Sequence, residues 1–207
     1  MGEVSWILFT GASLAVILAP GQDMLLVMSR GLGQGARAGV ATAAGVSAGL
    51  LGHTILAALG LGALLAASEA AYAALKYVGA GYLFYLGVRL LLSGGGLNAA
   101  RLSGAPLSRL FAQGALSNLS NPKIVLFYFS FLPQFVPATA SDPSLLLLAL
   151  GVLFAALTFM VKGPVGYFAG ALSAWFGAHP MALAWMFRSS GAVLIGLGLR
   201  LAFAGRG

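Results

Sequence analysis

The chain has 207 residues, of which 60% are hydrophobic and 7% charged, and its mean hydropathy is +0.97. Since soluble domains carry roughly 25% charged residues, this composition excludes a water-soluble surface and indicates an integral membrane protein. The absence of cysteine excludes disulfides, thiolate metal sites and thiol redox chemistry. The 11 Lys and Arg, against 4 Asp and Glu, are scattered singly between apolar runs, which favours membrane topology over nucleic-acid binding.

The apolar runs predict transmembrane helices, because the strands of an outer-membrane barrel would alternate apolar and polar residues. At roughly 20 residues per membrane helix, the chain has room for about six of them in one domain covering 1–207. The N-terminal apolar stretch lacks the basic segment of a signal peptide and begins with Glu3. We therefore expect it to be retained as the first helix.

Glycine, proline and polar residues divide the chain into six predicted segments. In order, they cover about 4–33, 39–66, 71–92, 107–135, 145–161 (open to continuation past Gly163-Pro164) and 181–203. A Gly/Ser/Asn-rich linker at 93–106 separates two halves, about 1–95 and 105–207, and 136–144 forms a polar loop.

The first and fourth segments each contain an internal proline. Pro20-Gly21 lies just past the middle of the first segment, and Asn121-Pro122 lies at the middle of the fourth. Proline removes a backbone hydrogen bond and clashes with the preceding turn, so both helices should be broken there. Inside a membrane, the freed backbone groups need polar partners or a wet cavity.

The two halves resemble each other in sequence. "YLGVRLLLSG" at 85–94 and "GLGLRLAFAG" at 196–205 share L-G-x-R-L followed by glycine. Each half has three predicted helices, and because three is an odd number, two such repeats must be inverted relative to each other. The predicted fold is therefore an all-α membrane protein with six transmembrane helices in two inverted three-helix repeats, the pattern of secondary transporters.

The basic residues predict the orientation of this bundle. With the N-terminus outside, the cytoplasmic side receives Arg30, Arg37, Arg89, Arg101, Arg109 and Arg188, and the outside receives Lys76, Arg200 and Arg206. The positive-inside rule therefore favours both termini outside.

Asp23 is the first candidate for chemistry. It follows Pro20-Gly21 at the start of a half-helix, where free amides and the helix dipole favour negative charge. A carboxylate at membrane depth costs about 2.5–3.5 kcal/mol on insertion scales, so it should face the bundle interior. Binding a substrate ammonium group and carrying a proton are the functional interpretations; a plain helix cap or an interfacial charge is the alternative.

Lys123 is its expected counterpart at the second break. Its ammonium group should pair with Asp23 in an empty site and with a substrate carboxylate in an occupied one; a purely structural ion pair is the alternative. Upstream, Gln113, Ser117 and Asn121 repeat every four residues and share one helix face. That face predicts a hydrated path leading to the break.

For the remaining polar residues, a structural role is the first interpretation. Lys162 is interpreted as a lysine that snorkels to the cytoplasmic interface, and His53 as a hydrogen-bonded packing residue with a proton relay as the alternative. The candidate binding residues are thus Pro20, Gly21, Asp23, Asn121, Pro122 and Lys123, with Gln22, His53, Gln113, Ser117, Asn118 and Lys162 as the candidate pathway.

Several kinds of motif are absent from the sequence. No phosphate loop, paired metal-ligand spacing or nucleophile motif is present, so no metal, cofactor, ATP-driven pump or enzyme is expected. The glycine spacings Gly31-Gly35-Gly39, Gly45-Gly49 and Gly166-Gly170 favour close helix packing and are compatible with a homodimer.

Four separated stretches resemble the LysE/RhtB family of amino-acid exporters, in the right order and across nearly the whole chain. They are "APGQDMLLVMSRGLGQGARAGVATAAGVSAGLLGH", "LKYVGAGYLFYLGVRLL", "FAQGALSNLSNPKIVLFYFSFLPQFV" and "GAVLIGLGLRLA". By position, the family's Pro-Gly motif falls on Pro20 and Gly21, its acidic position on Asp23, and its Asn-Pro-Lys motif on 121–123. Where the family usually has a second proline after Pro-Gly, this chain has Gln22.

The resemblance implies export of amino acids or their derivatives across the bacterial inner membrane, coupled to protons. Both termini, which the basic residues place outside, would then lie in the periplasm. The resulting hypothesis places Asp23 on the ammonium and Lys123 on the carboxylate of a zwitterionic amino acid. Protonation of Asp23 from outside would release the substrate while the two halves rock about the site. Export of another small solute or ion, and a non-transporting membrane scaffold, are the alternatives.

Overall fold

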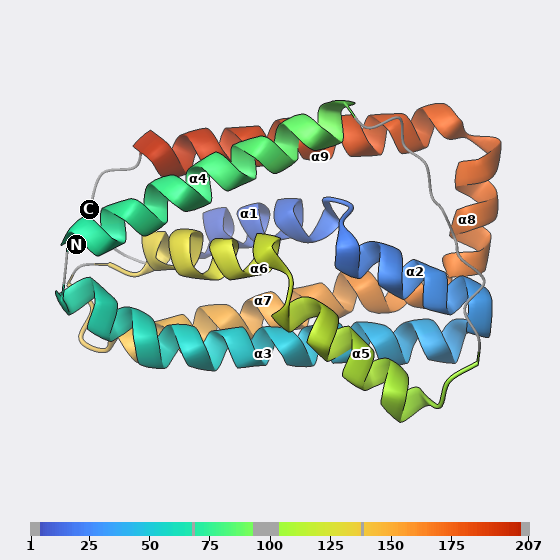
Figure 1. Ribbon diagram of the computed structural model, residues 1–207, viewed down its shortest axis with the longest axis horizontal. Helices are drawn as coiled ribbons and strands as arrows, with labels where there is room; N and C mark the ends of the chain where they lie inside the picture. Colours follow the sequence, from blue (N-terminus) through green and yellow to red (C-terminus); the bar gives the residue numbers. More distant parts are fainter. Residues whose placement is uncertain (1–4, 68, 93–103, 138, 204–207) are drawn as a thin grey trace.

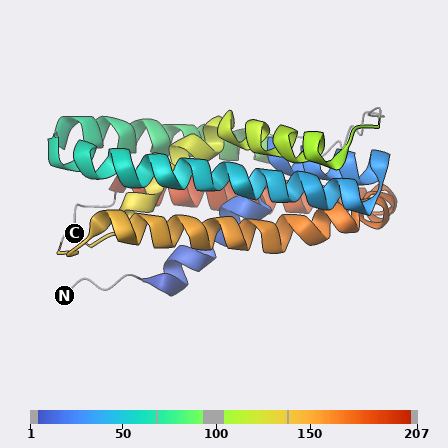
Figure 2. The same ribbon diagram turned by 90° about the horizontal axis from the view of Figure 1, so that it is seen from below.

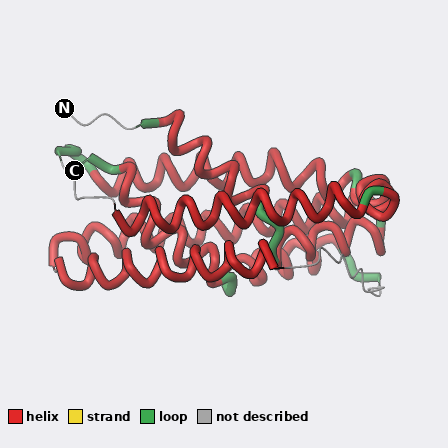
Figure 3. The backbone as a smooth tube through the Cα atoms, turned by 90° about the horizontal axis from the view of Figure 1, so that it is seen from above, coloured by secondary structure: helices red, strands yellow, loops and turns green. Residues whose placement is uncertain are grey.

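The computed structural model describes residues 5–67, 69–92, 104–137 and 139–203. Within these ranges all regular elements are helical (Figure 3). They are α1 (Trp6–Leu18), α2 (Gln22–Gln34), α3 (Ala36–Ala67), α4 (Glu69–Leu92), α5 (Leu107–Leu119), α6 (Pro122–Leu126), the π-helical turn η1 (Phe127–Phe131), the 3-10 turn η2 (Leu132–Phe135), α7 (Pro143–Tyr167), α8 (Ala169–Ala178) and α9 (Pro180–Phe203). Residues 93–103 of the predicted linker, Arg101 and Arg206 lie outside the described residues.

The helices form an elongated bundle in which α3, α4, α7 and α9 run lengthwise (Figure 1). The α4 and α9 helices lie side by side on one face, α3 and α7 lie on the opposite face, and α1 and α6 occupy the middle. Figure 2 shows α3 running between α5 and α7. The start of α1 and the end of α9 lie at the same end of the bundle, and the α2–α3 junction lies at the other (Figure 1).

Both predicted helix breaks are confirmed. The α1 and α2 helices meet at 57°, and the connecting residues Ala19 and Gly21 are extended, as expected next to a proline. At the second break, Asn121 caps α6 by accepting a hydrogen bond from the Lys123 backbone N–H at 3.1 Å, and Pro122 occupies the first helical position. Proline is well suited to that position because its missing N–H would be unpaired there anyway.

Three described helices are individually long and apolar enough to cross a membrane: Ala36–Gly60 within α3, α7 and α9. The bent pair α1–α2 makes a fourth if it is counted as one span. Large apolar side chains cover the outer surface, as lipid contact requires; Ile7 is 87% exposed and Phe203 85%. The α7 helix continues through Pro164 to Tyr167.

The α8 helix is an element that the sequence analysis did not predict. It crosses the end of the bundle opposite the start of α1, between α7 and α9 (Figure 1). Its residues are as apolar as those of its neighbours, so composition gives no sign that the chain changes direction here.

Glycines bring the long helices into backbone contact. A Cβ added to Gly166 of α7 would lie 2.6 Å from the carbonyl carbon of Gly39 in α3. Gly45 and Gly49 face the α5 backbone in the same way, whereas Gly170 has nothing within 4 Å. In lipid, helix association depends on such close packing instead of on the hydrophobic effect. Most of the predicted small-residue contacts are thus used inside the chain and give no support to a homodimer.

Candidate functional site

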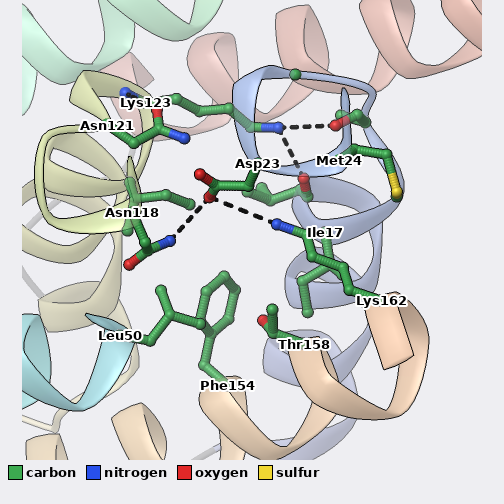
Figure 4. A pocket seen from close by; sticks show the side chains of 14 residues that line it. Ile17, Asp23, Met24, Leu50, Asn118, Asn121, Lys123, Phe154, Thr158 and Lys162 are labelled. Carbon is green, nitrogen blue, oxygen red and sulfur yellow. Dashed lines mark hydrogen bonds and ion pairs between the residues drawn. The ribbon is translucent and has the colours of Figure 1, made fainter. Parts of the chain in front are cut away.

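A cavity lies where the two helix breaks meet α7 (Figure 4). Side chains from α1, α2, α3, α5, α6 and α7 line it, so both halves of the chain contribute. Three of them are charged: Asp23, Lys123 and Lys162. Apolar walls come from Ile17 and Phe154, among others. The sequence analysis predicted the two breaks, Asp23 and Lys123 as binding residues and Lys162 as a pathway candidate, and the structure places all three charges in one cavity.

Asp23 lies in the first turn of α2 and is 2% exposed. Its Oδ2 accepts a hydrogen bond of 2.8 Å from Asn118 Nδ2, and its Oδ1 accepts one of 3.2 Å from Ser117 Oγ. The helix start and these two donors from α5 compensate a carboxylate that is removed from water.

Lys162 is the ion-pair partner of Asp23, at 3.5 Å between Nζ and Oδ2. The interpretation of Lys162 as a snorkelling lysine is therefore wrong: the residue is 5% exposed and points into the cavity (Figure 4). The physical reason lies in the packing of α2 against α7. Gly31 of α2 lies against Gly166 of α7, which brings the α7 turn that carries Lys162 next to Asp23. The glycine spacing was the available signal, but it does not identify the partner helix.

Lys123 does not pair with Asp23, so that expectation is also wrong. Its Nζ donates hydrogen bonds to the backbone carbonyls of Val16 at 2.9 Å and Ala19 at 3.0 Å. Val16 lies four residues before Pro20, so its carbonyl is the one that proline leaves without an intrahelical donor. Lys123, from one broken helix, thus caps the first half of the other.

His53 bonds the corresponding carbonyl at the second break, which also accepts a hydrogen bond from the Asn121 backbone N–H at 2.9 Å. Its Nε2 lies 3.2 Å from the backbone oxygen of Asn118, which stands four residues before Pro122. Because a carbonyl only accepts, Nε2 carries the hydrogen. The ring is 3% exposed and packs near Tyr128, with centroids 5.6 Å apart. This geometry agrees with the interpretation of His53 as a hydrogen-bonded packing residue.

The predicted polar face of the fourth segment is present only in part. Gln22 Nε2 donates to Ser117 Oγ at 3.1 Å, and Arg30 Nη2 donates to Gln113 Oε1 at 2.8 Å. Asn121 lies beyond the end of α5 and caps α6, so it leaves this face. Polar side chains from α2 to α5 therefore connect along the interface towards the α2–α3 end. Arg30, which the sequence analysis used only for topology, belongs to this row.

In the described part of the chain, no three His, Cys, Asp or Glu side chains come together as a protein metal site would need. The charged and polar side chains that line the cavity offer ionic and hydrogen-bonding contacts. A buried carboxylate, two ammonium groups and neutral donors suit a small ligand that carries both signs of charge.

The model of the LysE type translocator family matches residues 14–205. The chain belongs to the LysE family. The resemblance noted in the sequence is thereby confirmed, and the family is one of transporters. No solved structure gives a significant match to the chain.

Similar proteins include several efflux proteins. This LysE-family chain is 31% identical over 172 residues to a homoserine/homoserine lactone efflux protein of Salmonella typhimurium, covering 82% of each chain. It is 34% identical over 138 residues to a leucine efflux protein of the same organism, covering 65% of this chain and 64% of that one. An uncharacterized membrane protein of Pseudomonas aeruginosa is 34% identical over 195 residues, covering 91% of this chain and 90% of that protein.

Proposed function

We propose that this protein exports amino acids or their derivatives across the bacterial inner membrane and couples export to protons. The observation that carries the proposal is the buried Asp23 at the start of a half-helix, facing a cavity between two broken helices. The names of its relatives, which include leucine and homoserine efflux proteins, favour this class of substrate over inorganic ions.

In this proposal Asp23 binds the substrate's ammonium group or a proton, one at a time. A carboxylate held by Asn118, Ser117 and Lys162 can exchange the ammonium of Lys162 for that of a substrate without becoming an isolated buried charge. The apolar wall around Ile17 and Phe154 would take an aliphatic side chain. A proton arriving from the periplasm neutralises Asp23 and releases the substrate.

We further propose six transmembrane spans arranged as two inverted repeats. Gly87 and Gly198 are equivalent in the repeated L-G-x-R-L sequence, and Ala80 and Gly191 each lie seven residues earlier. A Cβ on Gly87 would lie 2.6 Å from the Gly191 oxygen, and a Cβ on Gly198 would lie 2.9 Å from the Ala80 oxygen. The α4–α9 contact is thus made twice with the roles exchanged, as a two-fold relation requires.

The proposed orientation places both termini in the periplasm. The start of α1 and the end of α9 share one end of the bundle, which agrees with an even number of crossings (Figure 1). The α2–α3 junction, with Arg30 and Arg37 nearby, lies at the opposite end and fits the cytoplasmic side by the positive-inside rule. Rocking of one repeat against the other would open the cavity alternately to each side.

The test is counterflow into proteoliposomes loaded in turn with each member of a panel of amino acids and inorganic ions. We expect labelled zwitterionic amino acids, leucine and homoserine among them, to accumulate only in vesicles that contain the protein. An imposed proton gradient should accelerate their net efflux. Exchange of ions without exchange of any amino acid would contradict the proposal.

A further inference from the structure

One face of α7 presents a second pair of polar groups to the cavity. Thr158 and Lys162 are four residues apart, so they lie on the same side of the helix, and both line the cavity (Figure 4). They are 2% and 5% exposed, respectively. Neither belongs to the two broken helices that carry the family motifs.

The Thr158 hydroxyl lacks a hydrogen-bond partner among the described residues. Other buried threonines in this chain bond the carbonyl four residues earlier: Thr42 to Ala38 and Thr54 to Leu50, each at 2.8 Å. Thr158 does not, although it is equally buried. An unpaired buried hydroxyl is costly, so one at a cavity wall indicates a position where a ligand can bind.

The Lys162 ammonium is loosely held. Its distance of 3.5 Å to Asp23 Oδ2 is longer than the roughly 2.7–2.9 Å of a strong charge-assisted hydrogen bond. Asn118 Nδ2 lies closer to the same oxygen, at 2.8 Å. An ammonium group has three donors, and within the described residues Lys162 uses one of them. Lys123, by contrast, is bonded to two carbonyls of α1.

We propose that Thr158 and Lys162 form a subsite for the carboxylate of the substrate. This inference rests on the proposed function: Asp23 binds the ammonium group of the amino acid, and the subsite binds its carboxylate. On binding, the substrate's ammonium group replaces Lys162 at Asp23, and Lys162 turns with the Thr158 hydroxyl to the substrate's carboxylate. The empty and the loaded site then carry the same net charge.

The subsite makes the carboxylate a requirement for tight binding. An amine of the same shape would displace Lys162 from Asp23 and leave that ammonium buried without a counter-ion, which is strongly unfavourable. A zwitterion restores both pairings. The site should therefore discriminate between an amino acid and the corresponding decarboxylated amine.

The experiment compares binding of leucine and of 3-methylbutylamine, its decarboxylated analogue, to detergent-purified protein. Wild-type protein is expected to prefer leucine by roughly 10- to 100-fold, the worth of a charge-assisted hydrogen bond. In K162Q the affinity for leucine should fall by a similar factor, while that for the amine stays level or rises because Asp23 has lost its competitor. A purely structural role for Lys162 would weaken both ligands together, and that result would overturn the proposal.

Thr158 provides a pair of complementary variants: valine keeps the shape of the side chain, and serine keeps its hydroxyl. T158V removes the hydroxyl and should lower the affinity for leucine by roughly 2- to 10-fold without changing that for the amine. T158S keeps the hydroxyl and should bind leucine like the wild type. Equal behaviour of T158V and T158S, or an unchanged preference in K162Q, would overturn the subsite while leaving amino-acid export intact. If wild-type protein binds no amino acid at all, the proposed function fails, and the subsite with it.

Discussion

Replacement of Asp23 by Asn is expected to lower proton-driven amino-acid efflux by roughly 100-fold or more, because it removes a buried charge-pair partner worth several kcal/mol. Asn has nearly the same size and can still bond Asn118 and Ser117, so the cavity keeps its shape. It cannot attract an ammonium group or carry a proton. It also leaves Lys162 buried without the counter-ion that it has now.

The measurement is efflux from amino-acid-loaded proteoliposomes, with and without an imposed proton gradient. The matched control is D142N. Asp142 lies in an exposed loop, where it caps α7 by accepting a hydrogen bond from the Leu145 N–H at 2.9 Å, and Asn caps helices equally well. D142N should transport at the wild-type rate. Full transport by D23N would rule out Asp23 as the binding and coupling residue.

Replacement of Lys123 by Met should destabilise the protein as well as stop transport. The change leaves the carbonyls of Val16 and Ala19 without their donor at the end of α1. Each unsatisfied buried carbonyl costs about 1–3 kcal/mol, so the loss is about 2–6 kcal/mol. We expect the apparent Tm in detergent to fall by several degrees.

Thermal unfolding followed by fluorescence-detected size exclusion measures this effect, with R188M as the control. Arg188 is exposed on α9 and does not line the cavity, so its loss should leave Tm nearly unchanged. The original expectation, in which Lys123 binds the substrate's carboxylate, makes the opposite prediction: K123M would weaken amino-acid binding at an unaltered Tm. The two variants together therefore decide whether Lys123 supports the break or contacts the substrate.

The breaks could be predicted from the sequence because the chemistry of proline is local. Pro20 and Pro122 lack an N–H wherever they stand, and a membrane helix offers no water to replace it. The same rule identifies Val16 and Asn118 as the residues whose carbonyls lose a partner. In the structure these two carbonyls accept hydrogen bonds from Lys123 and His53, respectively.

The role of Lys162 could not be predicted, because it depends on which helices meet. Its own neighbourhood in the sequence, next to Gly163-Pro164, is that of a helix end, whereas α7 in fact continues to Tyr167. Only the close approach of Gly31 to Gly166 brings it to Asp23. The α8 helix was missed for a related reason: in a chain that is apolar almost everywhere, hydropathy does not show where a helix turns across the bundle.

The central claim, that the cavity between α2, α5 and α7 holds the transported amino acid, is tested most directly by protection of a single cysteine. The natural chain has no cysteine, so M24C in the cavity wall and S141C in the exposed loop each provide a unique thiol. A small methanethiosulfonate reagent should label M24C more slowly as the transported amino acid is added. The concentration that halves the labelling rate should equal the concentration that half-saturates transport. The labelling rate of S141C should not change. Labelling of M24C that is unaffected by a saturating, transported amino acid would contradict the account.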